Sequence, residues 1–493
     1  NNNTYIRHKA DISQRIGKLK IGYIDDHELN TFDSTSYDLA LSSYQFFDYQ
    51  FYISNGDSSK NNYRFFYRER YDQHSDSFNL IPVAKGTTIG NEIEFKNLKN
   101  HKLHFISSYR TLEIKDTNFI QQKPENNLLG RIDYDFKAFK NAISFNNFYE
   151  IGSGLELRKE FLYLQVAAGQ GIYTWIDYNG DGIKDLNEFE IAQFQDQAQY
   201  IRIFTPSNQY TKTFSNELNQ GLFIRPERVW SNEKGLKKFI SRFSNQSRVR
   251  ILTKTNQFNG ITSFNPFQNN ISDTALISTT RNLKNTFYFN RISSVFGSEF
   301  TFNDNRTKTL LSNGFDARQK TYKEIAFRWN IKRVFTLEGS VEEGTKIANA
   351  DYTSGRNYAI NYVVVKPSFI YQPSTSFRIT FEGKISEKNN SPDLGDEKAS
   401  VREIGTTIKY NKAEKGSLNG SLKMIRITYN GVQNSSLGFE MLEALKPGIN
   451  YTWNIGYQRS ISKTLQLSIQ YTGRKSENNR MIHTGGMEVR AFF

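Results

Sequence analysis

The sequence predicts an all-β fold, a transmembrane antiparallel β-barrel of about 20–24 strands with short turns at one end and long extracellular loops at the other. Tyr and Phe supply 28 and 39 of the 493 residues, while Pro supplies 9, and this composition favours strands. Segments of about ten residues alternate apolar and polar side chains, as tilted strands that cross a bilayer do. No stretch approaches the roughly 18 consecutive apolar residues of a membrane-spanning helix, so a membrane-spanning chain of this kind must close into a barrel.

The C-terminal quarter shows the alternation most regularly. One face of the predicted strand 449–457 consists of Ile449, Tyr451, Trp453, Ile455 and Tyr457. The opposite face consists of Asn450, Thr452, Asn454 and Gly456. After a turn at 460–463, the strand 465–471 repeats the pattern. Because side chains alternate between the two faces of a strand, this hairpin is predicted to have one apolar and one polar face.

The same pattern recurs in both halves of the chain. A hairpin is predicted around the turn 372–375, and a strand is predicted over 131–137. Long polar connections are predicted over 264–273, 303–319 and 386–400. The apolar residues change face between Leu418 and Leu422 on one side and Ile425 and Ile427 on the other, which predicts a β-bulge.

A soluble β-sandwich or a β-solenoid is the alternative, because half-buried strands also alternate in those folds. Many of the segments are longer than the roughly 5–6 residues of soluble strands. Their polar faces also carry charged residues, while the opposite faces are dense in aromatic residues. Both observations favour the membrane barrel.

The last nine residues, Gly485–Phe493, form a predicted strand that ends on an aromatic residue. Met487, Val489, Ala491 and Phe493 share the predicted lipid-facing side, and Glu488 and Arg490 share the other. This ending resembles the C-terminal recognition strand of bacterial outer-membrane proteins. The resemblance implies a location in the outer membrane of a Gram-negative bacterium, contact with its lipid, and recognition by the barrel-assembly machinery.

Asp177–Glu188 matches the twelve-residue calcium loop of EF-hands, with oxygen ligands at positions one, three, five, nine and twelve and Gly182 at position six. The predicted Ca²⁺ ligands are the side chains of Asp177, Asn179, Asp181, Asp185 and Glu188 and the backbone carbonyl of Ile183. The alternative is an acidic, solvated turn, for which Asn-Gly and Asp-Gly pairs are common. A predicted strand, 171–176, replaces the first helix of an EF-hand, so the loop is expected to act as a structural clip within a surface insertion, 168–206.

The segment from Gly169-Gln170-Gly171 to Tyr200-Ile201-Arg202-Ile203-Phe204-Thr205-Pro206, with the Asp-rich loop inside it, resembles a stretch of large surface and outer-membrane proteins of Bacteroidota. The resemblance implies relatives such as nutrient-uptake barrels with surface lipoproteins and barrels of the type 9 protein-secretion apparatus. No plug domain or energy-coupling box is visible in the sequence.

Charge and residue usage exclude several classes of function. The net charge is +14, but Lys and Arg are spread along the chain, so no nucleic-acid partner is predicted. The absence of Cys excludes disulfides and thiol catalysis. His101 and His104 fall on opposite faces of a predicted strand and cannot share a metal. No motif selects a catalytic residue, and the chain is not predicted to be an enzyme.

Residues 1–493 are therefore expected to form one barrel, which acts as a conduit or channel-forming component for uptake or export. A barrel of this size leaves a wide lumen, so protein or lipoprotein partners are expected to fill or cap it within a complex. The alternative function is a non-conducting structural or assembly scaffold that anchors surface partners in the outer membrane.

Overall fold

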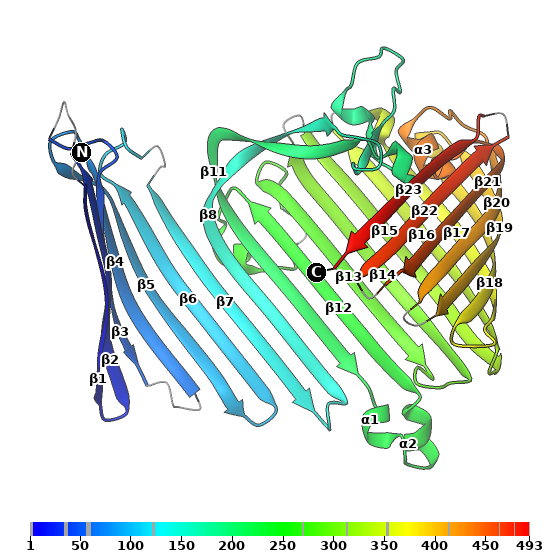
Figure 1. Ribbon diagram of the computed structural model, residues 1–493. Helices are drawn as coiled ribbons and strands as arrows, with labels where there is room; N and C mark the ends of the chain where they lie inside the picture. The colour runs from blue at the N-terminus through cyan, green and yellow to red at the C-terminus, as the bar shows by residue number, and fades with distance from the viewer. Residues whose placement is uncertain are drawn as a thin grey trace. The chain divides into compact units, whose positions relative to one another are not determined.

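The computed structural model shows an antiparallel all-β fold, as the sequence predicts (Figure 1). It describes residues 3–33, 38–55, 61–120, 124–268, 271–311, 314–351, 354–412, 415–462, 464–477 and 479–492. Over these residues the chain forms 23 strands in one sheet, which agrees with the predicted fold class and strand number. The predicted terminal aromatic, Phe493, lies outside the described residues.

The strands follow one another along the chain with few helices between them. The first eleven are β1 (Asn3–Ile16), β2 (Leu19–Phe32), β3 (Tyr44–Ser54), β4 (Asn61–Ser75), β5 (Leu80–Leu98), β6 (His101–Ile114), β7 (Glu125–Ala138), β8 (Ile143–Gln165), β9 (Tyr173–Trp175), β10 (Phe189–Ile191) and β11 (Tyr200–Ile224). The next six are β12 (Phe243–Thr255), β13 (Leu276–Phe289), β14 (Phe296–Leu311), β15 (Gly314–Lys332), β16 (Phe335–Ala350) and β17 (Tyr358–Tyr371). The last six are β18 (Phe377–Asn390), β19 (Lys398–Lys412), β20 (Gly416–Tyr429), β21 (Gly448–Ser460), β22 (Leu465–Ser476) and β23 (Ile482–Ala491).

The α-helices are short and lie in connections. They are α1 (Glu227–Trp230), α2 (Gly235–Ile240) and α3 (Ser436–Leu442). Within the described residues, no helix has both the length and the apolar composition needed to cross a membrane.

The chain divides into two compact units. Unit 1 contains residues 1–158, 208–224 and 248–279. Unit 2 contains residues 159–207, 225–247 and 280–493. Within each unit, strands that are consecutive in the sequence pair antiparallel, as in β3 with β4 and β16 with β17.

In unit 2 the strand register sorts apolar and charged side chains onto opposite faces. Ile325 of β15 lies opposite Val341 of β16, and Val341 lies opposite Val365 of β17. These three side chains are 60%, 47% and 37% exposed, respectively. Their sequence neighbours Glu324 and Glu342 are register partners on the other face. We call the face of Ile325 the outward face and that of Glu324 the inward face of unit 2.

Unit 1 has a comparable apolar row. Phe51, Tyr67, Ile89 and Tyr109 are consecutive register partners on β3 to β6. All four side chains are more than one third exposed. The predicted alternation therefore places a continuous apolar surface on one face of the sheet in each unit.

Two predicted loops are instead wholly or partly strands among the described residues. Residues 303–311 belong to β14 and residues 314–319 belong to β15, and Arg306 pairs with Gln319 between these two strands. In the predicted loop 386–400, β18 continues to Asn390 and β19 begins at Lys398. The polar residues of the first hairpin suit a strand because they bond one another: Thr321 donates to Asp304 (2.9 Å), and Arg306 pairs with Asp304 (2.9 Å). These strands continue past the exposed apolar rows into polar residues. A polar segment in this sequence therefore does not by itself indicate a loop.

The predicted bulge in β20 is also wrong. The register of β20 is continuous with β19 and with β21. Ile425 and Ile427 are inward residues that are 6% and 3% exposed, and they are buried in one cluster with Val401, Leu442 and Leu445. The apolar pattern changes face because the segment that contains α3 covers the inward face at this level, not because the strand is irregular.

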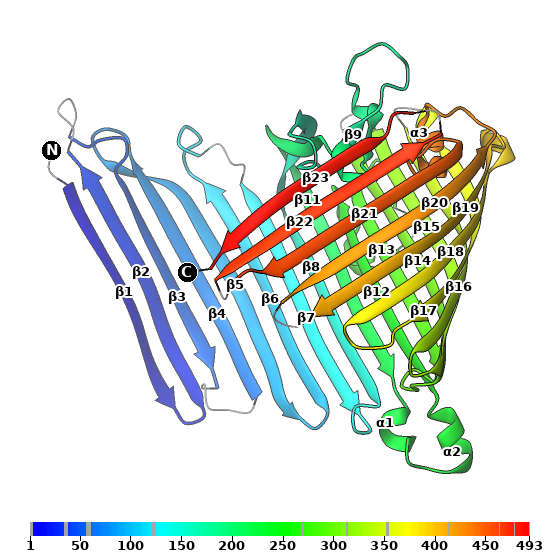
Figure 2. The ribbon, with the colours of Figure 1, turned by 45° about the vertical axis from the view of Figure 1, so that its right-hand side comes forward.

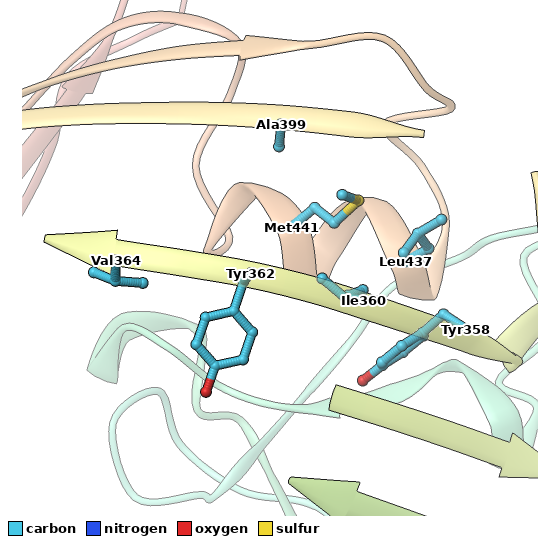
Figure 3. Packing of buried hydrophobic residues seen from close by; sticks show 7 residues of the cluster. All are labelled: Tyr358, Ile360, Tyr362, Val364, Ala399, Leu437 and Met441. Atoms are coloured by element: carbon cyan, nitrogen blue, oxygen red, sulfur yellow. The ribbon is translucent and has the colours of Figure 1, made fainter. Parts of the chain in front are cut away.

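A second buried cluster lies under α3 (Figure 3). Leu437 and Met441 of α3 pack against the inward side chains of β17 and against Ala399 of β19. The β17 residues are Tyr358, Ile360, Tyr362 and Val364. Met441 is fully buried and Ile360 is 1% exposed. The folded core of unit 2 is therefore a helix packed on one end of the inward face of the sheet.

We predict that Gly416→Ala destabilises the β19–β20 hairpin, whereas Gly456→Ala does not. Gly416 has φ +148°, and a Cβ there would lie 2.2 Å from the backbone oxygen of Gln458, but a Cβ at Gly456 would meet nothing within 4 Å. The strain should lower the free energy of unfolding by roughly 1–3 kcal/mol. Denaturant unfolding in detergent micelles measures the difference, and equal midpoints for the two variants would contradict the prediction.

Candidate metal site in the loop between strands β8 and β11

The Asp-rich segment lies in the connection between β8 and β11, residues 166–199. Tyr173–Trp175 forms β9, inside the strand predicted over 171–176, and it pairs with β10. Tyr173 is also the register partner of Tyr200, the first residue of β11. The connection is thus a small folded subunit of the sheet, in which the turn 176–188 joins two paired strands.

The first three predicted ligands shape the turn with their own side chains. The carboxylate of Asp177 accepts hydrogen bonds from the backbone N–H of Gly180 (2.6 Å) and of Gly182 (2.9 Å). Asn179 Oδ1 accepts from Asp181 N–H (3.0 Å), and Asp181 Oδ1 accepts from Ile183 N–H (2.6 Å). Gly182 has φ +74°, a conformation that glycine adopts without the strain of a side chain. The sequence thus brings Asp177, Asn179 and Asp181 onto one turn.

Glu188, the predicted twelfth-position ligand, is 1% exposed. Its carboxylate accepts from the Trp175 indole N–H (2.8 Å) and from Tyr178 N–H (3.1 Å). Across the described residues, no Lys, Arg or His forms an ion pair with Glu188. A buried carboxylate held only by neutral donors carries a large desolvation cost, and a bound cation would offset that cost.

The remaining predicted ligands lie on the exposed side of the turn. Asp185 is exposed, and Ile183, whose carbonyl is the predicted ligand, is 62% exposed. No group of three or more His, Cys, Asp or Glu side chains is gathered around a metal position in the part of the chain that the structure describes. The donor types and the bent turn suit Ca²⁺, and the buried Glu188 carboxylate lies at the base of the turn.

Glu190 of β10, two residues after Glu188, anchors the turn to the rest of unit 2. Glu190 Oε1 accepts from Arg356 (2.8 Å), from the Ser436 hydroxyl of α3 (2.7 Å) and from the Tyr178 hydroxyl (3.2 Å). Arg356 and Glu190 are each 7% exposed. Burial raises the pKa of Tyr178 well above its ordinary value, and the nearby Glu190 carboxylate adds to that shift. Tyr178 therefore stays a neutral hydrogen-bond donor.

Two further contacts fix the connection 166–199. Asn434 Nδ2 donates to the backbone oxygen of Asp177, the first predicted ligand (2.7 Å). Asp196 accepts a bidentate pair of hydrogen bonds from Arg474 of β22. The Arg474 guanidinium also lies over the Phe194 ring, 4.4 Å from its centroid. Contacts from Arg474 of β22 and from Asn434 and Ser436 at the start of α3 thus hold the loop.

The segment that contains α3 is held to the inward face by charge. Glu443, directly after α3, accepts from Lys384 (2.8 Å) and Lys388 (2.9 Å) of β18. Lys388 also donates to the Met441 carbonyl (3.0 Å), and Lys346 pairs with Glu440. Burial by itself would raise the pKa of Glu443, but Lys388 and Lys384 outweigh it and lower the pKa to about 2.

A polar cavity of about 840 Å³ adjoins Glu443 on the inward face of β13 to β20. Its lining includes Lys366, Lys384, Lys423, Glu382 and Glu403. Lys423 pairs with Glu403 (2.8 Å) and with Glu382 (3.6 Å). Cations on this face are therefore matched by carboxylates on neighbouring strands.

The sequence analysis did not predict helix α3 or the inward residues of β17 on which it packs. The signal was present in Tyr358–Val365, where apolar side chains occupy both faces of β17. Such a two-sided apolar run indicates a strand that is covered on both faces. The partners Arg356, Ser436 and Lys388 carry no local pattern that would mark them.

Comparisons with known proteins give distant structural likenesses. No protein-family model and no curated protein matches the chain. The siderophore receptor PirA from Pseudomonas aeruginosa is 9% identical, with a TM-score of 0.40 over 97% of this chain and 74% of that chain. The copper transporter OprC is 9% identical, with a TM-score of 0.39 and coverage of 99% and 78%. The ferric yersiniabactin uptake receptor FyuA from Yersinia pestis is 8% identical, with a TM-score of 0.38 and coverage of 100% and 79%.

We predict that acid releases the α3 segment. Because the pKa of Glu443 is about 2 in the folded chain and 4.5 ordinarily, its stabilising contribution is complete above about pH 4.5 and is lost as pH falls toward 2. Hydrogen exchange of residues 436–445 should accelerate over that interval. In the Glu443→Gln variant, the amides of residues 436–445 should already exchange fast at pH 6, and their protection should no longer depend on the titration of residue 443. In the exposed control Glu233→Gln, these amides should exchange as in the parent chain. Parent-like exchange of Glu443→Gln would contradict the assignment.

Proposed function

We propose that the chain is an outer-membrane β-barrel of a Gram-negative bacterium that forms a conduit for uptake or export. The observation that carries the proposal is the division of the sheet into an outward apolar face and an inward charged face. An exposed apolar surface of this extent requires lipid or a partner to cover it, and lipid covers such surfaces in membrane barrels.

The apolar face has the height of a bilayer. On β17 the outward residues run from Val363 to Tyr371, which is nine residues, and a tilted strand crosses the hydrocarbon core with about 9–11 residues. Outward residues just above this band are polar, including Lys323, Glu343 and Glu387. This boundary supports a placement in which the ends of β15 to β18, together with the loop 166–199 and α3, project from the membrane.

The charged inward face supports passage of polar cargo. A cavity lined by paired Lys and Glu side chains can stay hydrated, and its near balance of charges gives no strong preference for one sign of solute. Protein or lipoprotein partners at the cell surface would complete the conduit. We assign no catalytic residue.

A non-conducting scaffold is the second candidate, and one observation favours it. Helix α3 and the loop 166–199 occupy part of the inward face through buried apolar and ionic contacts. A lumen closed by its own loops would anchor surface partners without conducting.

Calcium is the proposed ligand of the turn 177–188, and the Bacteroidota-like segment that contains it supports an origin in that phylum. Asp177, Asn179, Asp181 and Glu188 would hold the ion together with Asp185 and the Ile183 carbonyl. The support comes from the bent turn and from Glu188, which is buried and has no ion-pair partner within the described ranges. The strand β23 supports recognition by the barrel-assembly machinery, since Met487 and Val489 are 72% and 53% exposed on one side of it.

We predict that removing the α3 segment opens the conduit. The full chain in planar bilayers should show small, infrequent current steps, and replacing residues 431–446 with a short Gly-Ser linker should increase step size several-fold, because lumen width sets the current. Replacing 391–397, a connection of the same unit, is the control. If neither replacement gives current steps although the protein inserts into the bilayer, the chain is a non-conducting scaffold.

We predict that calcium protects residues 166–199 from proteolysis. Extracellular calcium sites bind with Kd on the order of 10⁻⁴–10⁻³ M, so millimolar Ca²⁺ should slow cleavage and a chelator should restore it. Asp181→Ala should abolish the effect, while Asp393→Ala, in another surface loop, should not. Cleavage at the same rate with calcium, with magnesium and with chelator would show that the turn binds no calcium.

A further inference from the structure

The connection between β11 and β12 presents an exposed apolar helix face. It contains α1 and α2 and lies at the end of β12 opposite the loop that contains β9 (Figures 1 and 2). In α2, Leu236, Phe239 and Ile240 are 72%, 52% and 37% exposed. Their spacing, i, i+3 and i+4, places the three side chains on one face of the helix.

This face continues into the outward face of unit 2. The Phe239 ring lies 5.3 Å from Phe243 of β12, and Phe243 lies 5.6 Å from Phe287 of β13. Thr286, the neighbour of Phe287, is buried and bonds Thr301 of β14. Since side chains alternate along both strands, Phe287 shares the other face with Phe300, which pairs with Ile325 in the outward row.

The same end of unit 2 exposes more apolar side chains. Ile292 and Val295, in the turn between β13 and β14, are 73% and 57% exposed. The turn is tied to the end of α2 because Asn290 N–H donates to the carbonyl of Arg242 (2.7 Å). The turn between β13 and β14 and helix α2 thus both present apolar side chains beside Phe243 and Phe287 of the outward face.

Basic residues flank the apolar face of α2. Lys234, Lys237 and Lys238 lie within or beside the helix, and Lys237 is 3.9 Å from Glu233, with both side chains about half exposed or more. An apolar face bordered by lysines is the composition of helices that lie in a membrane interface, with apolar side chains among the acyl chains and ammonium groups at the phosphates.

We infer that α2 is an interfacial anchor that binds phospholipid head groups on the side of the membrane where the short turns lie. The inference rests on the proposed membrane location. Leu236, Phe239 and Ile240 enter the lipid leaflet beside Phe243 and Phe287. The lysines bind the phosphates of the lipid head groups. Anionic phospholipid strengthens the contact through charge.

The test locates an indole at α2 in vesicles. The full chain contains 4 Trp, so one variant replaces all of them with Phe and adds Phe239→Trp, and a reference variant keeps only Trp329 of the outward row. Both are reconstituted in phosphatidylcholine and phosphatidylglycerol vesicles with acyl-brominated lipid. We expect bromolipid to reduce emission from both indoles by about twofold and aqueous acrylamide to have little effect, as expected for buried interfacial side chains.

The outcomes separate this inference from the proposed function. If bromolipid quenches Trp329 but acrylamide alone quenches the indole introduced by Phe239→Trp, α2 projects into water and a soluble partner is the better occupant. If bromolipid quenches neither indole, the membrane location itself fails. Changing Lys234, Lys237 and Lys238 together to Gln should reduce quenching at α2 in vesicles with phosphatidylglycerol and leave Trp329 unchanged, and no effect would overturn the head-group contact.

Discussion

Antiparallel pairing between consecutive strands is the constraint on which the rest of the structure depends. Inside a bilayer every backbone N–H and C=O needs a protein partner, and registers such as the continuous one between β16 and β17 supply them. Once pairing fixes the register, period-two alternation assigns each side chain to a face. The outward row of Ile325, Val341 and Val365 and the inward Glu324 and Glu342 follow from that one geometric rule.

The division into an apolar outward face and a charged inward face ends where a second layer covers the inward face. Tyr358, Ile360 and Val364 face inward although they are apolar, because Leu437 and Met441 of α3 pack on them. Burial of these side chains would stabilise the segment by roughly 1.5–3 kcal/mol each, and charged contacts such as Lys388 with Glu443 determine its position. Burial of apolar side chains thus stabilises the α3 segment on the sheet, and the ion pairs favour one position of the segment.

The loop 166–199 and α3 are linked through Glu190, whose buried carboxylate accepts a hydrogen bond from Ser436 of α3 and forms an ion pair with Arg356. Removing one partner of a buried pair costs about 3–5 kcal/mol because the other charge stays buried. Glu188, two residues earlier, is buried and forms no ion pair with any residue that the structure describes. A cation bound at the turn would therefore stabilise the same strand, β10, that holds α3 in place.

The sequence by itself determined the all-β class, the strand number and the two faces of the strands, because these follow from local alternation. It also identified the turn formed by Asp177, Asn179 and Asp181, since those residues are close in the chain. The tertiary structure alone decided that the apolar pattern of β20 changes face under α3. It also decided that Arg356 and Ser436 meet at Glu190, and that Lys388 meets Glu443. Those features depend on contacts between residues far apart in sequence, which leave no period and no local spacing to detect.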